Sequence, residues 1–232
     1  MLKIAFDPIY AHPLPEGHRF PMLKYELIPQ QLLREGIITG ENLFEPGIVD
    51  EDTILLTHER QYWEHLRDLT LPPKEERRIG FPLSAQLVER EMRIAKGTID
   101  GCHFAFEHGV AFNVAGGTHH AGTNWGEGFC LLNDQAIAAN HLLLNELVAS
   151  ILIIDLDVHQ ATAPRRYLRT MRGYLPFRCM APIISPSVKS GRIWISPCPI
   201  ISAMKNTSAF CTIHCPASSP GKSPVLYFTL QE

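Results

Sequence analysis

Acidic residues are almost absent from the last third of this 232-residue sequence. Of the 24 Asp and Glu residues, Glu232 alone follows Gln160, whereas nine of the 21 Lys and Arg residues do. Half of the 18 prolines also lie after residue 160. This break in composition predicts two kinds of sequence: a domain over residues 1–160, and a basic tail over residues 161–232 that is rich in Pro and Ser and irregular in structure.

Other absences narrow the class of protein. No apolar run approaches the roughly 20 residues that span a bilayer, and the first apolar run is too short and too soon acidic for a signal peptide, so no membrane role is expected. The six cysteines lack the spacing of a small secreted domain, which favours a reducing, cytoplasmic setting. A formal net charge of −3 gives no indication of direct nucleic-acid binding.

The most informative stretch is residues 151–159. Four apolar, mostly β-branched residues predict a strand buried on both faces, and Asp155, Asp157 and His159 then follow at every second position. In an extended chain this spacing puts all three side chains on one face. Because such a cluster is costly without a charged partner, it favours a divalent metal, with zinc as the best candidate. The alternative is a group of solvated polar residues at a strand end.

Apolar periodicity predicts most of the secondary structure. Helices are expected over residues 22–34, with a kink or break at Pro29, and over residues 61–69, 84–107 and 136–148. In the helix at 84–107, Met92 and Phe106 are assigned to the core, and either Asn133 or Asp134 caps the helix at 136–148. Strands are expected over residues 2–6, 53–56, 110–115 and 151–155. The order strand, helix, strand from 110 to 155 predicts a right-handed crossover and a parallel sheet.

A second polar cluster follows the strand at 110–115. A Gly116-Gly117 turn is followed by Thr118 and the adjacent His119 and His120. Since ligands of open α/β sheets bind at the carboxyl ends of the strands, we expect the paired histidines and the 155–159 cluster to meet around one ion in a shared pocket. Alternatively, the two histidines are adjacent surface residues by chance and have no functional role.

Three motifs carry a resemblance to a known family: residues 115–121 (AGGTHHA), 128–134 (GFCLLND) and 155–159 (DLDVH). With the loop at residues 15–21 and Lys24-Tyr25 after it, they resemble the zinc-dependent histone deacetylase family, especially its bacterial members and the small class IV type. The resemblance covers residues 1–160. It implies the arginase/deacetylase α/β fold, a central parallel sheet flanked by helices.

The same resemblance implies roles for individual residues. Asp157 and His159 would be zinc ligands, and His119 and His120 would be the tandem active-site histidines, with His120 making the proton transfers. Asp155 would hydrogen-bond His119 and help to bind a structural monovalent cation such as K⁺. These roles imply metal-assisted hydrolysis of an amide.

The resemblance also implies how substrate is held. Gly128 and Phe129 would line a narrow channel for the acyl-lysine stem, and Arg19 would lie at its inner end, near where acetate leaves. The substrate would be an acetylated lysine in a protein or a small acetyl-amide. A two-metal ureohydrolase of the same fold is disfavoured by the tandem histidines.

The resemblance stops at Gln160. Residues 161–164 (ATAP) replace the family's Gly, Asp or Asn, and Gly-Thr, which removes the usual partner of His120. No Asp follows Asp157 to act as third zinc ligand, and the family's Gly-Gly-Tyr turn is absent. We therefore expect the C-terminal part of the fold to be missing and catalysis to be impaired. A non-catalytic or unstable remnant that binds metal weakly is the alternative.

A reading-frame shift explains both the loss of motifs and the change in composition. If the family-like string GNGTAEIF is encoded as GGC AAC GGC ACC GCG GAG ATA TTT, deleting one G from its first codon gives the sequence of residues 161–167 (ATAPRRY). With codons chosen in the same way, this offset recovers KERSDLDIPLP from residues 189–199. The hypothesis predicts that another frame of the gene encodes the missing deacetylase sequence. The alternative is a genuine variant C-terminus that completes the sheet in a different way.

Overall fold

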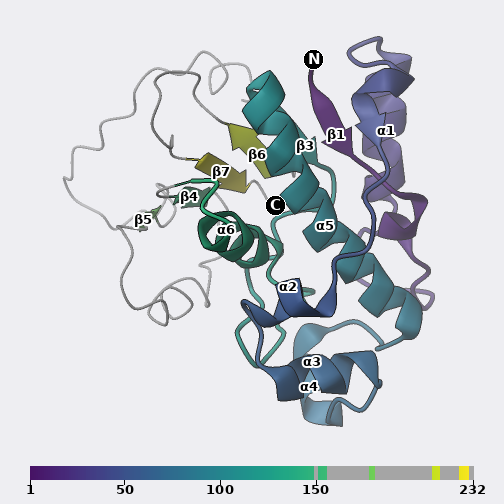
Figure 1. Ribbon diagram of the computed structural model, residues 1–232. Helices are drawn as coiled ribbons and strands as arrows, with labels where there is room; N and C mark the ends of the chain where they lie inside the picture. The colour runs from purple at the N-terminus through teal and green to yellow at the C-terminus, as the bar shows by residue number, and fades with distance from the viewer. Residues whose placement is uncertain (149–150, 156–177, 181–210, 215–224, 230–232) are drawn as a thin grey trace, which may run out of the picture.

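The computed structural model describes residues 1–148, 151–155, 178–180, 211–214 and 225–229 (Figure 1). Its strands form one seven-stranded sheet in the order β2-β1-β3-β6-β7-β4-β5. The strands are β1 (Lys3–Ala5), β2 (Leu43–Phe44), β3 (Val110–Asn113), β4 (Ile151–Asp155), β5 (Arg178–Met180), β6 (Cys211–His214) and β7 (Val225–Thr229).

Helices flank this sheet. The long helix α5 packs on β1 and β3 and against α6 (Figure 1). The α/β class predicted from the sequence is confirmed. The helical elements are η1 (Pro8–Ala11), α1 (Lys24–Arg34), η2 (Gly40–Asn42), α2 (Glu51–Leu55), α3 (Arg60–Arg67), α4 (Pro73–Ile79), α5 (Ala85–His108) and α6 (Asp134–Leu144).

The sheet is parallel except at one strand. β1 pairs in parallel with both β2 and β3, and β4 pairs in parallel with β5 and β7, whereas β6 runs antiparallel to β3 and β7. Because the direction reverses on both sides of β6, β3 and β4 point the same way. Their carboxyl ends therefore lie at the same edge of the sheet, as the predicted crossover requires.

Three of the strands, β5, β6 and β7, lie within residues 161–232, for which the sequence predicts irregular structure. At these three places the backbone is extended and paired, as in the alternative in which this segment completes the sheet in a different way. The other residues of the segment lie outside the described part of the chain, so the prediction of an irregular tail stays a prediction for them.

The strand predicted at residues 53–56 is wrong, because residues 53–55 lie in helix α2 and Leu56 is the C-cap of this helix. The Asp50 side chain caps this helix by accepting a hydrogen bond from the Thr53 backbone N–H at 2.8 Å. The acidic residues Glu51 and Asp52 in the first turn also suit the positive end of a helix dipole. These capping interactions outweigh the β preference of Thr53 and Ile54.

Helix α5 follows its prediction closely at both ends. The Ser84 side chain accepts from the Leu87 N–H at its start, and Gly109 ends it in the left-handed conformation with a φ of 85°. A Cβ at Gly97 would lie 2.8 Å from the Tyr10 hydroxyl, so close packing here requires glycine. Phe106, however, is 37% exposed, and its assignment to the core is wrong. Ala105 takes the inward position in that turn.

Two other helices correct the predictions in detail. Helix α1 contains Pro29 without ending there, so the predicted break is wrong, while the alternative of a kink stays a prediction. Helix α6 ends at Leu144 rather than at residue 148. Asn145 is its C-cap, and Glu146 then adopts a left-handed φ of 54°.

Within the described residues, no helix is both long and apolar enough to cross a bilayer.

Candidate functional site

A cavity of about 380 Å³ lies between the loop after β3, the loop before α1 and the glycine-rich loop before α6. His120, Gly128, Phe129 and Arg19, all predicted from the sequence as site residues, line it. Folding thus brings together three segments that are far apart in the chain. The other described lining residues are Phe20, Pro21, Lys24, Tyr25, Arg90, Thr118 and Cys130.

The paired histidines occupy different environments. The His119 side chain is buried, with 1% of the residue exposed, whereas His120 is half-buried and borders the cavity. Their rings lie edge to face, with centroids 4.2 Å apart and planes at 89°. Of the two imidazoles, that of His120 therefore borders the cavity, and that of His119 lies against it in the interior.

Gly128 and Phe129 form a tight turn beside His120. Glu127 and Cys130 exchange two backbone hydrogen bonds of 3.1 and 3.0 Å across them, and both central residues have positive φ, 56° and 67°. These are the features of a type I′ turn. For Phe129, a left-handed backbone costs about 1–2 kcal/mol.

The contacts of Phe129 offset this strain. Its backbone N–H donates to the Ile79 carbonyl at 2.7 Å, which ties the turn to the end of α4. Its ring packs against Phe20 and Phe81, with centroids 4.8 and 5.0 Å away, and the Arg19 guanidinium lies 4.9 Å from its centre. The turn is therefore fixed from several sides where it lines the cavity.

Gly128→Ala is expected to lower the free energy of unfolding by about 1–2 kcal/mol. The φ of 56° disfavours any side chain, and an added Cβ would lie 3.2 Å from Cδ2 of His120. Urea unfolding measures this loss. Gly47→Ala is the matched control, because Gly47 has open space around it and no positive φ. Equal stability of the two variants would contradict the assigned turn.

A buried ion pair lies next to the cavity and was missed in the sequence. Arg90 pairs with Glu91, donates from Nε to the Tyr10 carbonyl at 2.7 Å, and places its guanidinium 5.0 Å from the Tyr25 ring centre. Burial raises the pKa of Glu91, against the opposing effect of Arg90. A signal did exist, because residues 90 and 91 share a helical face with Leu87 and Ile94.

The predicted metal cluster is only partly within the described structure. Asp155 is the last residue of β4, at the sheet edge where β3 also ends, while Asp157 and His159 lie outside the described residues. Among the described residues, no group of three or more His, Cys, Asp or Glu is placed to hold a metal. The meeting of both clusters around one ion therefore stays a prediction, although a carboxylate and an imidazole suit zinc chemically.

Comparison with known proteins decides the family. The family model for the histone deacetylase domain matches residues 18–169. The chain belongs to the histone deacetylase family. Residues 1–17 and 170–232 lie outside the match, which begins later than the resemblance seen in the sequence over residues 1–160 and runs past Gln160.

Curated proteins that resemble this histone deacetylase family chain also match only part of it. An uncharacterized protein of Picosynechococcus sp. is 46% identical over 157 residues, covering 68% of this chain and 52% of the relative. The acetoin utilization protein AcuC of Staphylococcus aureus is 24% identical and covers 66% and 42%. Histone deacetylase 2 of Arabidopsis thaliana is 27% identical and covers 62% and 38%. The chain thus spans about half or less of the length of these relatives.

Solved structures share the fold. A histone deacetylase homolog crystallised with SAHA superposes with a TM-score of 0.59 at 24% identity, covering 68% of this chain and 45% of that one. A homolog from Aquifex aeolicus gives a TM-score of 0.58 at 22% identity, with the same coverage. At this level of identity, the likeness establishes that the matched part has the fold of these histone deacetylase homologs.

Proposed function

We propose that this chain carries part of the active site of a zinc-dependent deacetylase, which hydrolyses an acetylated lysine in a protein or a related small acetyl-amide. The main support is the cavity shared by His120, Gly128, Phe129 and Arg19. We also propose that the protein is cytoplasmic, because its cysteines lack the spacing of a small secreted domain. We further propose that it has no direct nucleic-acid or membrane partner.

In this proposal His120 makes the proton transfers. Its half-buried imidazole borders the cavity, where it takes a proton from the attacking water and returns one to the departing lysine amine. His119, buried 4.2 Å behind it from ring centre to ring centre, supports the positive charge that develops on His120. Asp155 would orient His119 and help to hold a monovalent cation such as K⁺.

Asp157 and His159 would hold the zinc ion, which when bound supplies Lewis-acid polarisation of the acetyl carbonyl. Gly128 and Phe129 would flank the acyl-lysine stem. Arg19, with its guanidinium against the Phe129 ring, would meet the acetate product.

We also propose that the deacetylase activity of this chain is impaired and that a frameshift in the gene caused the impairment. Catalytic zinc usually has three protein ligands, and no Asp follows Asp157 to complete the set. The change of composition after Gln160 and the loss of the family's motifs there support a change of frame near this residue. Sequencing the gene tests this: deacetylase sequence in another frame supports the shift, and its absence rules the shift out.

The purified, monodisperse full chain tests the function. We expect substoichiometric zinc and slow turnover of an acetyl-lysine peptide that a hydroxamate inhibits. His120→Ala should lower that turnover by about 100-fold or more, whereas His103→Ala, at an exposed position on α5, should not.

Each outcome has a meaning. Stoichiometric zinc with fast turnover would overturn the impairment. Turnover that is insensitive to hydroxamate and to His120→Ala would overturn the site assignment. Complete lack of zinc binding and turnover would favour the second candidate, a non-catalytic or unstable remnant, which the missing third ligand already suggests.

A further inference from the structure

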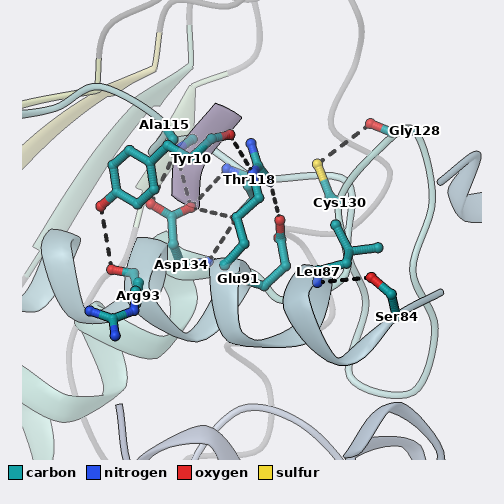
Figure 2. A network of polar contacts seen from close by, with 12 residues as sticks. Tyr10, Ser84, Leu87, Glu91, Arg93, Ala115, Thr118, Gly128, Cys130 and Asp134 are labelled. Atoms are coloured by element: carbon teal, nitrogen blue, oxygen red, sulfur yellow. Dashed lines mark hydrogen bonds and ion pairs between the residues drawn. The ribbon is translucent and has the colours of Figure 1, made fainter. Parts of the chain in front are cut away.

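The carboxylate of Asp134 is buried against the loop that carries the paired histidines. Asp134 is fully buried, and its carboxylate accepts hydrogen bonds from the backbone N–H groups of Gly117 and Thr118 and from the hydroxyls of Thr118 and Thr98. Figure 2 shows the Asp134 carboxylate pointing toward Thr118. Most of these donors therefore come from the two residues that precede His119.

Asp134 does not cap its own helix. The cap of α6 is Asn133, whose Oδ1 accepts from the Ala136 N–H at 2.9 Å. The Asp134 side chain turns instead to a segment 16 residues earlier, and its backbone N–H donates to the Thr118 hydroxyl at 3.1 Å. Three hydrogen bonds thus join Thr118 and Asp134, which is more than a first-turn acid in a helix requires.

Two successive backbone N–H groups of the loop converge on the Asp134 carboxylate. The adjacent N–H groups of Gly117 and Thr118 point at the same carboxylate oxygen, at 3.1 and 2.7 Å. Such convergence of successive N–H groups is typical of an anion-binding backbone nest. Gly117 has a φ of 94°, a conformation that favours glycine, so the turn and its anion fit together.

Asn133 holds the other end of the same loop. Its Nδ2 donates to the carbonyls of His119 and Ala121, at 3.3 and 3.1 Å. The dipeptide Asn133-Asp134 therefore fixes the backbone on both sides of the histidine pair. Both imidazoles project from this clamped segment, so the direction of His120 depends on the backbone that these bonds hold.

We propose that Asp134 is a positioning residue, whose carboxylate sets the backbone of residues 117–118 and thereby the direction of the His120 imidazole. This inference rests on the proposed function only for its effect on turnover. In Asp134→Asn, the amide NH₂ would face N–H donors, so at least one loop bond would be lost and the histidine pair would shift.

The test compares Asp134→Asn with Thr98→Val in the full chain. Thr98 donates to the same carboxylate at 2.6 Å but comes from α5, and its other hydrogen bond is accepted from Asn113 Nδ2 at 2.8 Å rather than from residues 117–118. Both variants should unfold at lower temperature than wild type. Only Asp134→Asn should shift the NMR signals of the His119 and His120 rings and lower kcat by about 10- to 100-fold with little change in KM.

Two results would overturn the proposal. Either the histidine signals and kcat of Asp134→Asn match those of wild type, or Thr98→Val changes them equally. If wild type has no turnover, the proposed function fails, but the ring signals still decide the positioning role. If Asp134→Asn does not fold, Thr118→Val, which removes one hydroxyl from the same contact, must shift the ring signals while Thr98→Val does not.

Discussion

Glu91→Leu is expected to lower the free energy of unfolding by about 3–5 kcal/mol. The Arg90 and Glu91 side chains are 2% and 1% exposed, and they pair with each other beside the cavity. Leucine would leave the Arg90 guanidinium buried without its counter-charge. Because Arg90 is held by the Tyr10 carbonyl and the Tyr25 ring, it cannot easily turn toward water. Urea unfolding at neutral pH measures the loss.

Two further variants sharpen this measurement. Glu89→Gln breaks the partly exposed pair with Arg93 on the same helix, and we expect it to cost less than about 1 kcal/mol. The double variant Arg90→Met/Glu91→Leu should be more stable than Glu91→Leu, because it removes the unpaired charge. A loss for Glu91→Leu no larger than that for Glu89→Gln would show that the pair is not buried as described.

Acidification from pH 6.5 to 4 is expected to remove about 3 kcal/mol of stability through His58 alone. Burial lowers the pKa of His58 to about 4. The unfolded chain therefore takes up this proton near pH 6.5, whereas the folded chain takes it up only near pH 4. The contribution is fully present above pH 6.5 and is lost as the pH falls to 4, at 1.36 kcal/mol for each pKa unit. Burial also lowers the pKa of His12, which adds a loss in the same range.

His58→Gln tests this source of acid sensitivity. His58 Nε2 accepts a hydrogen bond from the Asn133 N–H at 3.1 Å, and a glutamine oxygen can accept the same bond without titrating. Unfolding free energies measured at several pH values should fall less steeply in this variant than in wild type. A wild-type slope in His58→Gln would assign the acid sensitivity to other groups.

Local patterns in the sequence predicted much of the fold. The apolar period predicts α5 to within one residue at each end, because the side chains that set this period are close neighbours in the chain. The strand at Thr53 was predicted wrongly for a related reason. There, β-branched side chains suggested a strand, while the Asp50 cap determined a helix.

The candidate site was predicted in part. The motifs identified His120, Gly128, Phe129 and Arg19, and the cavity brings these four together. The type I′ turn at Gly128-Phe129 could not be read from the sequence, because phenylalanine rarely takes a left-handed backbone. Contacts with Ile79 and with aromatic rings from other segments hold it there.

The sequence by itself determined the family motifs, the main helices and the chemical groups available for catalysis, because each depends on residues near one another in the chain. Only the tertiary structure decided which partner each buried polar group takes. Asn133 and Asp134 are equally good caps by sequence, yet one caps α6 and the other binds the histidine loop. That choice follows from distant donors that meet the carboxylate only in the folded protein, where a buried charge must be fully hydrogen-bonded.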